Sequence, residues 1–392
     1  MGIYQTDPSK FVAITRSRNG FSYTFDDGSL GDAEEPEAGV QCGNGSVLVN
    51  GNEIWRKVSI VETNTRFRSG DTMLVGRLIE PPGANNATPL IVYAHGSEDT
   101  AWIERGRDPY QMVGRGISVF VYDKRGTGQS EGQYTQNFPL LADDLVAASK
   151  EAKRLAASRF GRFGLIGLSQ GGWIAPLAAD RAGADFIGIG YGLVADIREE
   201  DAAQVQKELR DAGFGDEILA IAREITDVTA RIAASDYTDG LDELTELQKR
   251  FSAEPWFLLM RGSYTGVFLS MSADELRTNG VPQFNNLDID WTLNPMNVMR
   301  GVEAPQLWIL AGEDREAPID LTLERLSILR EEAKDITIYM FPDTDHGMWE
   351  YDQKDDGSRE YLRVTPGFYE LMADWAKGRV TVDYGSAFAI SE

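Results

Sequence analysis

Short apolar runs recur along the chain from about residue 60, and each ends near a glycine or an aspartate. They are rich in β-branched and aromatic residues and lie at 89–96, 117–126, 162–171, 184–192, 305–314 and 335–347. Runs of this kind are typical of strands buried on both faces of a parallel sheet. Segments 140–157 and 320–333 have the length and the Ala, Leu, Glu, Lys and Arg content of crossover helices. The alternation predicts an α/β fold with a mostly parallel, doubly wound sheet.

The first 60 residues have a different pattern. "GFSYTFDDG" alternates aromatic and polar positions into an Asp-Gly turn, and "SVLVNGNEIW" brackets Asn50-Gly51 as a two-residue hairpin would. We therefore expect a small N-terminal β module over residues 1–60.

A helical pattern interrupts the strands between about 196 and 290. Apolar residues there repeat at steps of three and four, at Ile218, Ile221, Ile225, Val228 and Ile232. This spacing defines one face of an amphipathic helix. A helical insertion between two strands of an α/β core is most simply a lid. The expected division is therefore a β module (1–60), a first core part (61–195), a helical lid or cap (196–290) and a second core part (291–392).

The formal charge of −24 changes which partners are plausible. Nucleic acids and anionic membrane surfaces repel an acidic protein, so we expect neither as a partner. No apolar run approaches the length that crosses a bilayer, and the first residues lack the basic-then-apolar pattern of a secretory signal. These features predict a soluble protein. They leave open its oligomeric state and whether it is cytoplasmic or exported with a signal removed.

Histidine is the scarcest informative residue, present only as His95 and His346. Transition-metal sites usually combine several His or Cys ligands, and the chain has one cysteine, Cys42. We therefore expect no metal and no cofactor. Any histidine that acts as a general base must be one of these two.

The stretch "GLIGLSQGGW" (164–173) places Ser169 between Gly167 and Gly171, directly after an apolar strand and before a helical segment. This context is that of a nucleophile elbow, a strained turn that exposes a serine at the end of a strand. A serine hydroxyl is a poor nucleophile at neutral pH. It needs a base, a group that orients the base, and donors for the oxyanion that forms.

The order of residues along the chain selects the partners of Ser169. In sites built on this elbow the acid and then the histidine follow the nucleophile, so His346 is the predicted base. Asp314 follows the strand-like "LWILAGED" and is the predicted acid. Glu313, Asp343 and Asp345 remain rival acids, with Asp345 ranked second because neighbouring loop residues often point apart.

The predicted oxyanion donors are two main-chain amides, those of Gln170 and of Ser97 in "HGSED". His95 is expected to hold that loop by a hydrogen bond. Glu98 and Asp99 lie unusually close to a developing negative charge and are candidate contacts for a substrate cation. Trp173 is a candidate wall of an acyl or aryl pocket, with core packing as the simpler alternative.

These motifs together resemble the α/β-hydrolase superfamily: "HG" at 95–96, "DKRGTGQS" at 123–130, "GLSQGG" at 167–172, "GEDREAP" at 312–318 and "DHG" at 345–347 stand in that family's order. The resemblance covers roughly 60–195 and 286–392. "YDKRGTGQSEG" is similar to a stretch in bacterial serine aminopeptidases, acyl-thioester hydrolases and small carboxylesterases. It implies that Ser169, Asp314 and His346 match the triad, that Ser97 and Gln170 match the oxyanion positions, and that Asp123 and Arg125 brace a loop.

Three functions remain in competition. The leading hypothesis is a serine hydrolase that cleaves small-molecule carboxylic esters through an acyl-enzyme on Ser169. The second is an aminopeptidase or amidase of the same fold, in which Glu98 or Asp99 binds a substrate amino terminus. The third is a non-catalytic binding protein, which is disfavoured because such proteins usually lose a member of the triad, and all three candidates are present here.

Overall fold

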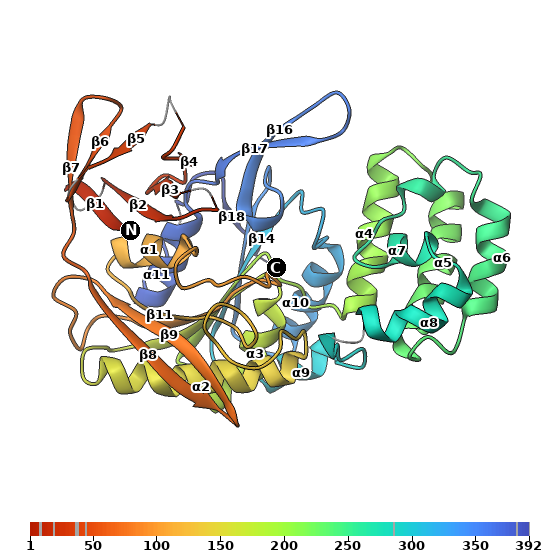
Figure 1. The fold of residues 1–392 in the computed structure, drawn as a ribbon, viewed down its shortest axis with the longest axis horizontal. Helices are drawn as coiled ribbons and strands as arrows, with labels where there is room; N and C mark the ends of the chain where they lie inside the picture. The colour runs from red at the N-terminus through yellow and green to blue at the C-terminus, as the bar shows by residue number, and fades with distance from the viewer. Residues whose placement is uncertain are drawn as a thin grey trace.

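Three β-sheets, of nine, seven and two strands, and the helices that pack around them make up the described part of the protein in the computed structural model (Figure 1). The structure describes residues 1–7, 10–18, 20–35, 39–43, 45–284, 287–381 and 383–391. The largest sheet has nine strands in the order β18-β15-β14-β13-β12-β10-β11-β9-β8. Their bounds are β8 (Val61–Ser69), β9 (Thr72–Glu80), β10 (Leu90–Ala94), β11 (Ser118–Tyr122), β12 (Phe163–Leu168), β13 (Phe186–Gly190), β14 (Gln306–Ala311), β15 (Ile336–Phe341) and β18 (Phe388–Ala389).

The six strands from β10 to β15 run parallel to one another, whereas β9 pairs antiparallel with β11, β8 with β9, and β18 with β15. These six are the six apolar runs of the sequence. The sheet as a whole is mixed, so the prediction of a mostly parallel sheet is confirmed for its centre.

Both faces of the central sheet are buried, which explains why its strands are apolar throughout. Leu90 and Val92 of β10 pack into one core with the helices α2 (Phe138–Ala156), α3 (Gly171–Ala182) and α10 (Asp320–Glu331). The alternate residues Ile91 and Tyr93 pack into a second core with α1 (Asp108–Gly114) and α11 (Phe368–Lys377). The period of two along each strand thus divides its side chains between two helical layers.

The N-terminal strands form a separate antiparallel sheet in the order β4-β3-β2-β1-β7-β6-β5. Their bounds are β1 (Gly2–Asp7), β2 (Lys10–Arg16), β3 (Phe21–Phe25), β4 (Leu30–Asp32), β5 (Val40–Cys42), β6 (Ser46–Val49) and β7 (Glu53–Lys57). Asn50 and Gly51 both have positive φ, 48° and 70°, as a tight hairpin requires. Because Val49 pairs with Glu53, the connection has three residues, and the predicted two-residue turn is wrong by one.

The N-terminal sheet shares a core with the central sheet. Ile3, Phe11 and Ala13 are buried in the same cluster as Tyr110 of α1 and Leu371 of α11. On its other face the sheet has a small core of its own.

A group of helices lies between β13 and β14 in the chain and to one side of the central sheet, green to teal in Figure 1. The helices are α4 (Ile197–Asp211), α5 (Asp216–Ala234), α6 (Leu241–Phe251), α7 (Thr265–Leu269) and α8 (Ala273–Phe284), followed by α9 (Pro295–Gly301). Ile225, Val228 and Ile232 of α5 are buried in their common core, as the spacing predicted. Ile218 and Ile221 pack at its margin.

A capping box starts α4. The Asp196 side chain accepts from the main chain of Glu199, and the Glu199 side chain accepts from the main chain of Asp196. In the described part of the chain, no helix is both long enough and apolar enough to span a bilayer.

Candidate active site

Ser169 stands on a strained turn between β12 and α3. Its φ is +50°, a conformation that is uncommon for residues other than glycine. The turn is so tight that a Cβ at Gly167 would lie 2.3 Å from the Gly171 carbonyl oxygen, and one at Gly171 would lie 2.0 Å from the Ala94 carbonyl oxygen. The glycines on either side of Ser169 are therefore required by the close approach of main chain.

A chain of hydrogen-bond distances joins Ser169, His346 and Asp314. The Ser169 Oγ lies 2.9 Å from His346 Nε2, and His346 Nδ1 lies 2.9 Å from Asp314 Oδ2. The three residues come from the ends of β12, β15 and β14, because parallel strands present their carboxyl ends at one edge of the sheet. Asp314 is 2% exposed, and its Oδ1 also accepts from the amides of Glu316 and Ala317. Its orientation is thus fixed from two sides.

The rival acids are occupied elsewhere. The Asp345 carboxylate pairs with Arg359 at 2.6 Å and accepts from the Tyr361 hydroxyl at 2.9 Å. Glu313 lies 3.4 Å from Lys207, and Asp343 is exposed. Of the four candidate acids, only Asp314 has a hydrogen bond to the His346 ring among the described residues.

Several charges raise the pKa of His346 to about 9. Burial is the largest single effect and would lower this pKa, but the charge and hydrogen bond of Asp314, together with the charges of Glu316 and Glu200, outweigh it. Glu316 Oε2 lies 3.6 Å from Nε2. Glu200 belongs to α4, so the helical insertion places a carboxylate within electrostatic reach of the imidazole. Burial raises the pKa of Glu200 itself to about 8.

Ser97 lines the cavity beside Ser169, whereas Gln170 begins α3 and is buried. Among the described residues, no hydrogen bond uses the main-chain amide of either one as a donor. Both predicted oxyanion donors are therefore without a protein acceptor.

The other predicted residues separate into two groups. Glu98 lines the cavity, and its carboxylate lies 3.1 Å from His95 Nδ1, while the His95 ring stacks on Trp102 at 4.9 Å. Asp99 is exposed and does not line the cavity. Trp173 does not line it either, because its ring stacks on Phe138 at 4.8 Å and its indole N–H donates to the Ala195 carbonyl.

The loop behind Ser97 is braced by residues of the "DKRGTGQS" stretch. Asp123 accepts from the amides of Trp102 and Ile103, at 2.8 and 3.1 Å. Arg125 makes a buried two-pronged ion pair with Asp144 of α2. These contacts agree with the bracing roles that the resemblance implied.

A hairpin that the sequence analysis missed forms one wall of the cavity. Strands β16 (Trp349–Gln353) and β17 (Arg359–Val364) follow His346 directly. Trp349 and Tyr361 line the cavity of about 340 Å³ that holds Ser169 and His346. Arg107 also lines it, with its guanidinium 4.5 Å above the Trp349 ring. Charged residues fill the hairpin sequence, so its strand pattern is weak.

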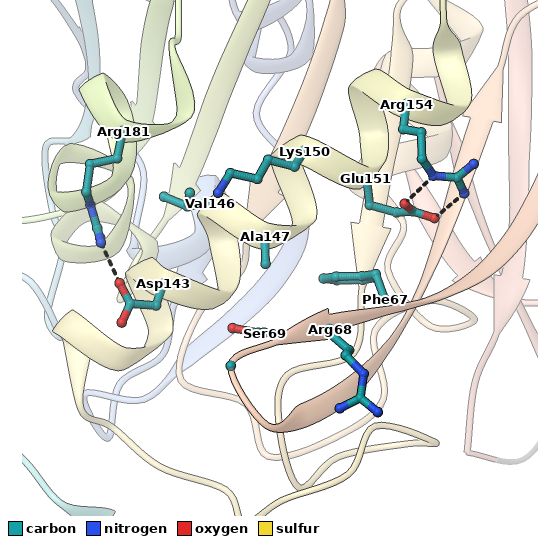
Figure 2. Close-up of a pocket in the computed structure, with 11 residues that line it drawn as sticks. Phe67, Arg68, Ser69, Asp143, Val146, Ala147, Lys150, Glu151, Arg154 and Arg181 are labelled. Carbon is teal, nitrogen blue, oxygen red and sulfur yellow. Dashed lines mark hydrogen bonds and ion pairs between the residues drawn. The ribbon is translucent and has the colours of Figure 1, made fainter.

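Other grooves are larger but lie apart from these residues. Figure 2 shows one of about 700 Å³ between α2 and the β8–β9 hairpin, where Arg181 pairs with Asp143 and Arg154 with Glu151. None of the predicted site residues lines it. Within the described ranges, no cluster of three or more His, Cys, Asp or Glu residues could hold a metal ion.

Comparison with solved structures found limited similarities. The chain has similarity to the Pyrococcus horikoshii acylaminoacyl peptidase, at 18% identity and a TM-score of 0.45, over 88% of this chain and 45% of that chain. It is also similar to the Pyrococcus furiosus esterase Pf2001, at 14% identity and a TM-score of 0.44, over 74% of this chain and 85% of that one. The α/β hydrolase GrgF from Penicillium sp. sh18 has 16% identity and a TM-score of 0.44, over 73% of this chain and 91% of that one.

This chain thus spans less than half of the acylaminoacyl peptidase. At such identities and scores, these likenesses carry no argument about fold or activity. No curated protein matches the chain.

A family model gives the more specific result. Residues 85–190 match the model described as serine aminopeptidase, S33. The matched segment runs from just before β10 to the end of β13 and contains Ser169. The resemblance expected from the motifs is confirmed for residues 85–190, the segment that matches the serine aminopeptidase model.

Proposed function

We propose that the protein is a serine hydrolase that cleaves carboxylic esters through an acyl-enzyme on Ser169. The observation that carries this proposal is the chain of contacts from Ser169 through His346 to the buried Asp314. A hydroxyl with a base in hydrogen-bond reach, and a base held by a third group, is the arrangement that activates a serine.

In the proposed reaction, the Ser169 Oγ attacks the ester carbonyl while neutral His346 takes the hydroxyl proton at Nε2. Asp314 holds Nδ1–H and stabilises the imidazolium that forms. The oxyanion is stabilised by the amides of Ser97 and Gln170. His346 then returns the proton to the leaving alcohol as the C–O bond breaks. A water molecule repeats the sequence, and it releases the carboxylic acid and restores the serine.

The surrounding parts have proposed roles as well. We propose that the helical insertion over 196–290 serves as a lid or cap, because the charge of Glu200 in its first helix acts on the pKa of His346. The β module over 1–60 supports the cavity wall, since the Gly28 carbonyl accepts from the amide of Val364 at the end of the wall hairpin.

Labelling with a fluorophosphonate probe tests this function. The probe forms a stable bond only with an activated serine, so peptide mapping should place the label in "GLSQGG". The labelled protein should lose its hydrolysis of short p-nitrophenyl esters in proportion to the label. A protein that hydrolyses no ester and takes no label would contradict the proposal.

The pH dependence of the reaction follows from the pKa of His346. The base works only when neutral, and its pKa is raised to about 9. We therefore expect kcat/KM to rise about tenfold per pH unit below that value and to level off above it. Glu316→Gln removes a carboxylate 3.6 Å from Nε2 and should move the midpoint to lower pH. Glu360→Gln, which changes an exposed carboxylate paired with Lys354, is the matched control and should leave the midpoint in place. A profile that is flat from pH 6 to pH 10 would contradict this expectation.

An amidase or aminopeptidase is the second candidate, favoured by the carboxylates of Glu98 and Glu316 in the cavity. These would attract a substrate ammonium group. If the protein is an amidase, Glu98→Gln should lower kcat/KM on amino-acyl amides about tenfold. The kcat/KM on acetyl esters should stay unchanged, because the glutamine side chain can still accept a hydrogen bond from His95. Asp99→Asn is the matched control, since Asp99 lies outside the cavity lining. Equal losses on both substrates, or none, would argue against this candidate.

A further inference from the structure

A buried lysine lies behind the two predicted oxyanion donors. Lys124 follows β11 and is 1% exposed. Its Nζ donates to the Gly96 carbonyl and, at 2.7 Å, to the Gln170 side-chain Oε1. Among the described residues, no carboxylate forms an ion pair with it. Lysines are almost never fully buried unless they are paired, so the cost of burying this one calls for a physical reason.

The Gly96 contact has a direct geometric consequence. No peptide bond in the described chain is cis. In a trans peptide the carbonyl oxygen and the amide hydrogen of the next residue point in opposite directions. When Lys124 holds the Gly96 carbonyl, the Ser97 N–H must point away from Lys124. Ser97 lies on the wall of the cavity beside Ser169, so the lysine fixes the plane of the peptide that supplies this donor.

The Gln170 contact acts on the second donor. Gln170 follows Ser169 at the start of α3, and its side chain is buried with its oxygen on Lys124. One amine therefore joins the loop after β10 to the turn after β12. These are the two segments whose amides must converge on one oxygen atom.

We propose that Lys124 is a positioning residue that assembles the oxyanion hole by holding Gly96 and Gln170 in fixed register. This inference rests on the proposed function. It does not depend on the charge of the lysine, since a neutral amine still has two N–H groups for its two acceptors. Burial lowers the pKa of Lys124 to about 7, so a neutral amine is accessible.

Lys124→Met tests the inference because methionine has a similar length and no donor. It leaves the buried Gly96 carbonyl without its lysine donor, and that peptide is then free to rotate. We expect kcat on a p-nitrophenyl ester to fall about 100-fold, as when one oxyanion donor is lost, with KM within about threefold. The inhibition constant of a trifluoromethyl ketone, which forms a hemiketal oxyanion on Ser169, should rise by a similar factor. Affinity for the carboxylic acid product should stay unchanged.

Lys153→Met is the matched control. Lys153 also donates to two main-chain carbonyls, those of Ala182 and Gly183, at 2.7 and 3.2 Å. These lie at the far end of α3, about 18 Å along the helix from Gln170. The control should keep wild-type kcat and ketone affinity.

The outcomes separate the inference from the function on which it rests. An active wild type with an equally active Lys124→Met overturns the inference alone, as does a variant that loses product and ketone affinity together. A wild type that neither hydrolyses esters nor labels at Ser169 overturns the proposed function, and the inference with it. If Lys124→Met does not fold, Lys124→Gln decides: its shorter amide should give an intermediate kcat, and wild-type kcat would overturn the inference.

Discussion

Ser169→Ala is expected to lower kcat on a p-nitrophenyl ester by roughly 10⁴- to 10⁶-fold. The change removes only the Oγ that lies 2.9 Å from His346 Nε2. Without it no acyl-enzyme forms, and any residual rate comes from water that attacks a substrate held by the oxyanion donors. Steady-state and burst kinetics at pH 9.5 measure the effect, because at that pH most of the His346 in the wild type is neutral.

The matched control for this prediction is Ser270→Ala. Ser270 follows α7 and is exposed, and its hydroxyl donates to the Val267 carbonyl at 2.7 Å. It should keep wild-type kcat and fluorophosphonate labelling. Near-wild-type turnover by Ser169→Ala, with a folded protein by circular dichroism, would rule out the acyl-enzyme mechanism.

Asp314→Asn is expected to cost about 10⁴ in kcat. The asparagine keeps the shape of the side chain, but its NH₂ group can donate to His346 Nδ1. A histidine that accepts at Nδ1 carries its proton on Nε2 and cannot take the proton of Ser169. The loss should appear mainly in kcat, since Asp314 is buried behind the imidazole and 2% exposed.

Asp343→Asn controls for this change, because Asp343 lies on the same loop as His346 but is exposed. It should have wild-type kinetics. Asp345→Asn is informative in a different way. Asp345 holds Arg359 and Tyr361, so we expect lower thermal stability with much of kcat retained. A larger kcat loss in Asp345→Asn than in Asp314→Asn would reassign the acid.

The central strands and Ser169 could be predicted because their signals are local. Unbroken apolar runs follow from burial on both faces of a sheet, and the glycines around Ser169 follow from the approach of main chain to within 2.0–2.3 Å of a would-be Cβ. Because the acid and then the histidine are expected to follow the nucleophile in the chain, His346 was the one candidate base and a few carboxylates were candidate acids.

What the sequence could not reveal depends on contacts between distant segments. Glu200 is one acidic residue among many on a polar helix, and its effect on the pKa of His346 emerges only in the folded chain. In the sequence, Lys124 is only one residue of a loop motif. Its hydrogen bonds to Gly96 and Gln170 become apparent only in the folded chain. Trp173 follows Ser169 by four residues, yet the first turn of α3 carries its ring into the core.

The shared core of the two sheets has a consequence for shortening the protein. Truncation near residue 60 falls between the N-terminal sheet and the first strand of the central sheet. It would not separate two parts that each have a complete core. It would remove Ile3, Phe11 and Ala13 from their contacts with α1 and α11 and expose apolar surface on the remaining part of the protein. It would also take away the acceptor of the Val364 amide, at the root of the hairpin that walls the cavity. Aggregation of such a fragment would therefore follow from its exposed apolar surface. Lack of esterase activity in the fragment would not be evidence against the role of Ser169.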